Sequence, residues 1–67
     1  MELKNKLKSF RHKHEMNQTE FAEHLGVGRH LYNQWELNRT QPNLESTWKI
    51  LKKLNIPIEE LFYEDDL

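Results

Sequence analysis

The stretch from Gln18 to Gly28, QTEFAEHLGVG, contains the residues that decide the fold of this chain. Ala22 stands four residues before Gly26, and so small a side chain lets two helices approach closely. Gly26 can adopt the positive φ that ends a helix at little steric cost. Val27 is then expected to point back into the core and to fix the direction of the next helix. The stretch therefore predicts two short helices joined by a tight glycine turn, which is a helix-turn-helix.

Start and stop signals along the chain place the helix ends and predict three helices besides the two of the helix-turn-helix. Asn17 and Glu20 have the spacing of a capping box at the start of the second helix. We expect helices over residues 2–14, 18–25 and 28–36, a fourth that begins after Asn43, and a short fifth that opens at Pro57. The sequence thus predicts an all-α fold with five helices. Residues 1–67 are expected to form a single helix-turn-helix domain with an acidic C-terminal end at residues 59–67.

The apolar residues of these helices recur at helical spacing, which predicts one shared core. A chain of 67 residues buries only about 60% of the surface that it exposes when unfolded, so little room remains for an internal cofactor pocket. The core is expected to contain Leu7, Phe10, Phe21, Leu25, Tyr32, Trp35, Ile50 and Leu54.

The composition argues against an enzyme, a metalloprotein or a membrane protein. The chain has no cysteine, which excludes a disulfide or thiolate-metal site and fits a reducing cytosol. His12 and His14 point in different directions on a helix, and no nucleophile is paired with a base. No apolar run reaches membrane-spanning length, and no signal peptide opens the chain. We expect a cytoplasmic protein without catalytic residues, metal, cofactor or small-molecule ligand.

The charge of the chain is sorted along its length. The formal net charge is −1, although a nucleic-acid-binding domain is usually basic. Residues 1–54 hold ten basic and six acidic side chains, a balance of +4, whereas residues 55–67 hold five acidic side chains and no Lys or Arg. The basic part could therefore face a polyanion while the acidic end lies away from it. The alternative is that both runs are ordinary solvated faces.

The predicted helix at residues 28–36 has one apolar stripe and one polar face. At about 100° per residue, Gly28, Tyr32 and Trp35 share a stripe that must face the core. The opposite face carries the side-chain types that read base edges in the DNA major groove, namely Arg29, His30, Asn33 and Gln34. An ordinary solvated helix would favour Glu and Lys, and this face has neither. We therefore predict contacts to double-stranded DNA through this helix.

The chain from Leu7 to Phe62 resembles the Cro/C1 type of phage repressor, also called the XRE-like family. The resemblance is carried by the spacing from Phe21-Ala22 to Gly26-Val27, by Trp35-Glu36, and by the ending LNIPIEELF at residues 54–62. In size and ending the chain is most similar to small stand-alone repressors of Gram-positive bacteria. The resemblance implies a lambda-repressor-like DNA-binding domain that regulates transcription, as a homodimeric repressor at a palindromic operator.

The resemblance also implies roles for individual residues. Gln18 would contact a phosphate and steady Arg29, and Arg11 would form an ion pair with Glu36. Four positions depart from the family pattern: Gly28 replaces a usual Ser or Thr cap, Leu31 a polar residue, Tyr32 a β-branched aliphatic residue and Leu51 an alanine. The DNA backbone would be contacted by Gln18, Thr19, Gly28, Leu31, Asn38, Arg39 and Thr40.

The dimer contact is expected in the C-terminal segment, with Ile58, Phe62, Tyr63 and Leu67 as candidates. The last three of these residues could instead close the small core. A second function is also open, in which the same fold serves as an antitoxin or another module that binds a partner protein. A palindrome in the protein's own promoter would favour the repressor, and a neighbouring toxin gene would favour the antitoxin.

Overall fold

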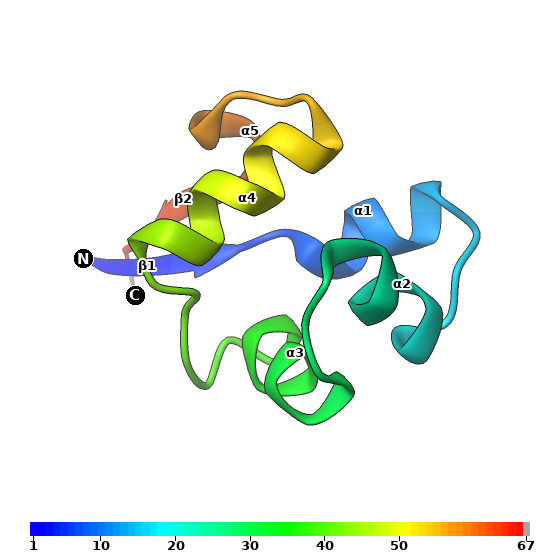
Figure 1. The fold of residues 1–67 in the computed structure, drawn as a ribbon. Coiled ribbons are helices and arrows are strands. Elements are labelled where there is room, and N and C mark those ends of the chain that lie inside the picture. The colour runs from blue at the N-terminus through cyan, green and yellow to red at the C-terminus, as the bar shows by residue number, and fades with distance from the viewer. Residues whose placement is uncertain (67) are drawn as a thin grey trace.

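A computed structural model describes residues 1–66, which form five short helices and a two-stranded antiparallel ribbon (Figure 1). The helix-turn-helix consists of α2 and α3, and α4 is the longest helix of the described chain. The elements in chain order are β1 (Glu2–Asn5), α1 (Leu7–Lys13), α2 (Gln18–Leu25), α3 (Arg29–Glu36), α4 (Leu44–Leu54), α5 (Ile58–Leu61) and β2 (Phe62–Asp65).

The ribbon corrects the expectation of an all-α fold and of a first helix that begins at residue 2. β1 pairs with β2 in a register that runs from Glu2–Asp65 to Asn5–Phe62. Lys4 Nζ adds an ion pair to Asp65 Oδ2 at 2.9 Å. The strand escaped prediction because Leu3 and Leu7 have helical spacing, while the strand that pairs with β1 lies at the other end of the sequence. Figure 1 shows the two strands at the end of the molecule where both chain termini lie.

Local signals at the two ends of α2 act as the sequence predicts. The Asn17 side chain accepts a hydrogen bond from the Glu20 backbone N–H at 2.8 Å, and the Glu20 carboxylate accepts one from the Asn17 backbone N–H at 2.9 Å. The capping box is therefore confirmed. At the other end, Gly26 has φ 75°, and the N–H of Val27 donates to the carbonyl of Ala22. This left-handed residue ends α2 and turns the chain into α3.

One apolar core joins the helices and the ribbon. Six of the eight predicted core residues are buried, and Leu25 and Leu54 are partly buried against the same core. Phe62, a candidate for the dimer contact, is buried in the core of the chain, while Leu67 lies outside the described residues. The buried apolar residues are Leu7, Phe10, Phe21, Ala22, Tyr32, Trp35, Ile50, Leu61 and Phe62.

Candidate nucleic-acid interface

The apolar stripe of α3 anchors this helix to the core and leaves its polar face outside. Tyr32 and Trp35 are buried, and the Tyr32 ring meets Phe21 of α2 edge to face, with 5.7 Å between the ring centroids. Arg29 and His30, one helical turn earlier, are exposed. The aromatic contact therefore sets the angle at which the first turn of α3 projects from the molecule.

Side chains from α2 and α3 line a shallow hollow on this polar face. Gln18, Arg29, His30 and Asn33 form its walls. The Gln18 side-chain amide donates to Asn33 Oδ1 at 3.0 Å and to Glu36 Oε1 at 3.2 Å. Gln18 was expected to steady Arg29, but its amide holds Asn33 instead. The sequence spacing could not distinguish these two neighbours, because both lie on the same face of α3.

Behind the polar face, an ion pair joins α1 to the last residue of α3. Arg11 Nε and Nη2 donate to the two carboxylate oxygens of Glu36, each at 2.9 Å. A third guanidinium nitrogen, Nη1, donates to the carbonyl of Met16 at 3.3 Å. The Glu36 side chain is only 4% exposed, so the pair is shielded from solvent and ions. This fork-to-fork geometry fixes both the position and the rotation of α3.

The charge state of Glu36 follows from these contacts. Burial by itself raises the pKa of a carboxyl group, because it disfavours the charged form. Hydrogen bonds from Arg11 and Gln18 outweigh that penalty and lower the pKa of Glu36 to about 2. Burial raises the pKa of the neighbouring Tyr32 hydroxyl, which is neutral and has no hydrogen-bond partner among residues 1–66. Glu36 is therefore a fixed negative charge beneath the polar face of α3.

Asn5 of β1 holds the end of α3, a role that the sequence did not reveal. This side chain is buried, and its Nδ2 donates to the backbone carbonyl of Trp35 and to Gln41 Oε1, each at 2.8 Å. Its Oδ1 accepts from the N–H of Leu7 at 3.0 Å, at the start of α1. The ribbon is thus attached to α3 and to the loop that follows it.

Asn38 completes this amide network from the loop side. It has φ 59°, a left-handed conformation that asparagine tolerates better than most residues. Its Oδ1 accepts from the backbone N–H of Asn5 and from the side-chain amide of Gln41, at 2.8 and 2.9 Å. The Asn38 side chain is therefore occupied within the protein, whereas Arg39 and Thr40 beside it are exposed.

Of the remaining predicted DNA contacts, Thr19, Gly28 and Leu31 lie at the N-terminal ends of α2 and α3, and Gln34 lies in the second half of α3. Thr19, Gly28 and Leu31 are exposed, and Gln34 is half-buried. Gly28 precedes α3 without a side-chain cap, so the first N–H groups of this helix lack a cap from the preceding side chain. In the part of the chain that the structure describes, no helix is long and apolar enough to cross a membrane. The same residues contain no cluster of His, Asp and Glu that could hold a metal ion.

A family model described as a helix-turn-helix matches residues 7–61, from the start of α1 to the end of α5. The chain belongs to the Cro/C1-type helix-turn-helix family. As a member of this family it is a helix-turn-helix transcriptional regulator with a DNA-binding domain. The predicted resemblance is therefore confirmed, and α3 is the second helix of the helix-turn-helix.

Archaeal relatives align with this Cro/C1-type chain over almost their whole length. It is 40% identical over 65 residues to an HTH-type transcriptional regulator of Methanocaldococcus jannaschii, covering 96% of this chain and 98% of that protein. It is 34% identical over 64 residues to an HTH-type transcriptional regulator of Archaeoglobus fulgidus, covering 96% and 91%. A phage protein is similar as well. The cryptic phage CTXphi transcriptional repressor RstR of Vibrio cholerae is 32% identical over 62 residues, which cover 92% of this chain and 56% of RstR.

Proposed function

We propose that the protein is a transcriptional repressor that binds a palindromic operator as a homodimer, with α3 in the major groove. The observation that carries this proposal is the polar face of α3. It carries side chains of the types that read base edges, on a helix whose position is fixed by hydrogen bonds. Gln18 and the Arg11–Glu36 pair hold this helix from two sides. The similarity to RstR, which is named a repressor, supports repression over activation.

Four side chains are assigned to base contacts: Arg29, His30, Asn33 and Gln34. Arg29 lies in the first turn of α3 and is exposed, so its guanidinium can reach O6 and N7 of a guanine. The Asn33 amide can pair with an adenine, and Gln18 already restrains it from the side of α2. This restraint lowers the entropy that Asn33 would lose on binding.

The DNA backbone contacts are assigned to two parts of the protein, the N-terminal ends of α2 and α3 and the loop after α3. Gln18, Thr19, Gly28 and Leu31 lie near the start of α2 or α3, where backbone N–H groups attract phosphate. In the loop after α3, the side chains of Arg39 and Thr40 are exposed. We assign Asn38 an indirect part, because its side chain holds this loop to Asn5.

The homodimer follows from the small size of the interface. A single module of this kind buries about 600–1,000 Å² of protein surface on DNA, and one recognition helix reads only a few base pairs. Two copies related by a two-fold axis would read two half-sites about 34–36 Å apart. The acidic ribbon does not need to approach the DNA phosphates, because β2 and α2 lie on opposite sides of the view in Figure 1.

Selection of bound fragments from random DNA, with the full chain, tests this proposal. We expect enrichment of an inverted repeat whose half-site centres are one helical turn apart. Parallel selection with Arg29→Ala should lose the preference at one base pair of each half-site, whereas Lys8→Ala on the exposed side of α1 should return the wild-type sequence. Enrichment of no sequence, or of an unrepeated half-site, would contradict the proposal.

A further inference from the structure

Four side chains from α1, α2 and α3 form one continuous chain of hydrogen bonds beneath the polar face of α3. Arg11 donates through Nε and Nη2 to the carboxylate of Glu36, each at 2.9 Å. The same carboxylate accepts from Nε2 of Gln18 at 3.2 Å, and that nitrogen also donates to Oδ1 of Asn33 at 3.0 Å. The chain runs from a shielded ion pair to Asn33, whose side chain lines the hollow on the polar face. We call Arg11, Glu36, Gln18 and Asn33 the side-chain relay.

The charge of Glu36 decides which way the Gln18 amide faces. An ionised carboxylate accepts hydrogen bonds and donates none. The part of the Gln18 amide next to it must be the NH2 group, because Oε1 in that place would set two acceptors against each other. Although burial acts to raise it, the pKa of Glu36 is held at about 2 by the hydrogen bonds it accepts, so this carboxylate is ionised at neutral pH.

The Gln18 amide in turn decides which way the Asn33 amide faces. Gln18 Nε2 has two hydrogens, and it donates to Glu36 and to Asn33. The Asn33 atom that meets this N–H must be Oδ1, since the NH2 group in its place would set two donors against each other. The oxygen and nitrogen of an amide lie on opposite edges of its plane. Asn33 therefore holds Oδ1 on the side of α2 and Nδ2 on the opposite side.

We propose that the side-chain relay makes Asn33 select adenine over guanine, with Gln18 and Glu36 as positioning residues that orient its amide. The inference rests on the proposed function, in which α3 lies in the major groove, and it names a base and the cause of its selection. Adenine presents an acceptor at N7 and a donor at N6, whereas guanine presents acceptors at N7 and O6. The oriented amide meets adenine with Nδ2 on N7 and the second lone pair of Oδ1 on the N6 hydrogen. At guanine, the same Oδ1 would face O6.

An asparagine that turned freely would select less strictly. A half-turn of the amide exchanges Oδ1 and Nδ2, so a free side chain could present its NH2 group to guanine O6. The relay opposes this half-turn, because it would break the hydrogen bond from Gln18 and place two NH2 groups in contact. Glu36, a shielded charge at the end of α3, thus affects the choice of a base that it does not touch.

Competitive titrations of operators that are substituted at one base pair at a time test the base choice. Asn33→Ala first identifies the base pair, as the one at which the preference is lost. At that pair, we expect the wild-type protein to bind adenine about tenfold or more tightly than guanine. Gln18→Met keeps the length of the side chain and removes the amide, so the ratio should fall to about threefold or less. An unchanged ratio in Gln18→Met would overturn the inference.

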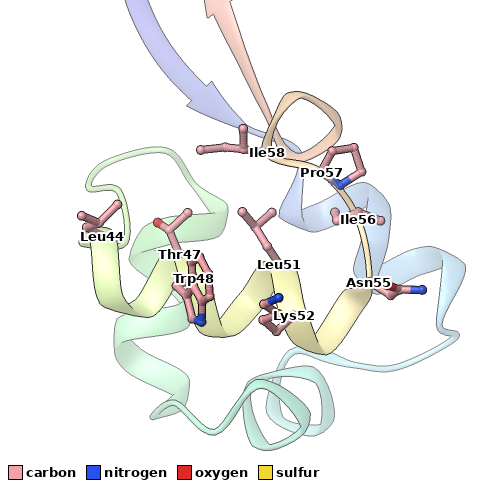
Figure 2. A pocket seen from close by; sticks show the side chains of 9 residues that line it. All are labelled: Leu44, Thr47, Trp48, Leu51, Lys52, Asn55, Ile56, Pro57 and Ile58. Atoms are coloured by element: carbon pink, nitrogen blue, oxygen red, sulfur yellow. The ribbon is translucent and has the colours of Figure 1, made fainter.

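Two control variants separate base choice from a general loss of affinity. Thr19 is exposed at the start of α2, beside Gln18 and outside the relay. Trp48 is 64% exposed in the groove between α4 and α5, which includes no residue of the relay (Figure 2). Thr19→Ala and Trp48→Ala should each keep the adenine-to-guanine ratio of the wild type, whatever happens to the total affinity. A ratio that fell equally in these controls would overturn the inference.

Hydrogen exchange of side-chain amides, measured by NMR on the full chain without DNA, tests the role of Glu36. The Gln18 amide protons should exchange about three- to tenfold more slowly than their intrinsic rate, the effect of about one hydrogen bond each. The exposed Asn43 amide should show no such protection. Asn33→Ala should remove the protection of one Gln18 proton, and Glu36→Gln should weaken that of the other. If Glu36→Gln does not fold, Asn33→Ala alone decides this point. An unprotected Gln18 amide in the wild type would overturn the relay.

The two measurements distinguish failure of this inference from failure of the proposed function. If the wild type selects an inverted repeat and Gln18→Met keeps the full adenine-to-guanine ratio, the inference fails and the proposed function stands. If the wild type prefers no DNA sequence, the proposed function fails and the base choice fails with it. Protection of the Gln18 amide would then still support the orientation of Asn33 in the free protein.

Discussion

Arg11 and Glu36 are 25 residues apart in the chain and are joined by two parallel hydrogen bonds of 2.9 Å. The same carboxylate accepts a third hydrogen bond from Gln18 of α2. One buried side chain thus receives donors from α1 and α2 while standing at the end of α3. The position of α3 is fixed by this single acceptor as well as by apolar packing.

Glu36→Gln should lower the free energy of unfolding at pH 7 by about 3 kcal/mol, because the Arg11 guanidinium keeps only a neutral partner in a shielded place. The pH dependence of stability should change with it. The pKa of Glu36 is lowered from 4.5 to about 2 in the folded protein. The unfolded chain therefore binds more protons between these two values, and the contribution of Glu36 is present above pH 4.5 and lost as the pH falls towards 2.

Urea denaturation over a pH series checks this prediction. Glu36→Gln should flatten the loss of stability in acid, and Glu23→Gln, a change on the exposed side of α2, should leave it as it is. A double-mutant cycle with Arg11→Met should give a coupling energy well above about 1 kcal/mol, the upper range for exposed pairs. An acid transition of unaltered slope in Glu36→Gln would contradict the assigned pKa.

The core assignment predicts a strong contrast between two leucines. Leu61 is fully buried, and Leu61→Ala should cost about 2–5 kcal/mol of unfolding free energy. Leu37 is 52% exposed, and Leu37→Ala should change stability by less than about 0.5 kcal/mol. Trp35→Ala should cost about 3–5 kcal/mol, enough to unfold a marginal domain. Chemical denaturation measures all three, and equal midpoints for the two leucine variants would refute the assignment.

Arg29 and Arg39 should differ in what their removal does to DNA binding. Arg29→Ala should cost about 1–3 kcal/mol on the operator and flatten the preference at one base pair. Arg39→Ala should weaken binding to all sequences alike and reduce the slope of log K against log salt by about 1. Titrations of matched and singly substituted operators across a salt series separate the two effects. The reverse pattern would mean that α3 lies differently on the DNA.

Asn5→Asp should lower the free energy of unfolding strongly, although the two side chains are nearly equal in size. The carboxylate cannot donate to the Trp35 carbonyl or to Gln41, and it places a buried charge against two oxygens. We expect a loss of about 3 kcal/mol or more at pH 7. Asn43→Asp is the matched control, since Asn43 caps α4 through Oδ1 and aspartate caps about as well, within about 0.5 kcal/mol. Thermal unfolding of both variants checks the prediction, and similar midpoints would show that the network contributes little.

The parts of the fold that follow local rules were predictable from the sequence. The bounds of α2 agree with the expected helix at residues 18–25, because the capping box of Asn17 and Glu20 and the left-handed Gly26 act within a few residues. The strand β1 was not predictable in this way. Its hydrogen bonds depend on β2, almost the whole chain away, and its four residues carry no alternation strong enough to indicate a strand.

Within the candidate site as well, the features set by local sequence were predictable and those set by distant contacts were not. The polar face of α3 could be read from helical periodicity, and the resemblance implied that Arg11 and Glu36 lie together. The hydrogen-bond network of side-chain amides could not be predicted from the sequence, because Asn5, Asn38 and Gln41 meet only after the ribbon has formed. Nothing in an asparagine at position 5 distinguishes a solvated side chain from a buried one. Leu61 was missed as a core residue for the same reason, since its burial depends on where α5 docks.

The pairing of β1 with β2 has a consequence for the synthesis of the protein. A ribosome makes the residues of α3 before it makes Leu61 and Phe62, which complete the core, or the strand that β1 needs. At about 5–20 residues per second, this delay is short but unavoidable. A chain interrupted after residue 60 would carry every residue assigned to DNA and would lack the packing that holds them in place. Prematurely ended products should therefore be degraded instead of competing with the finished protein for its binding sites.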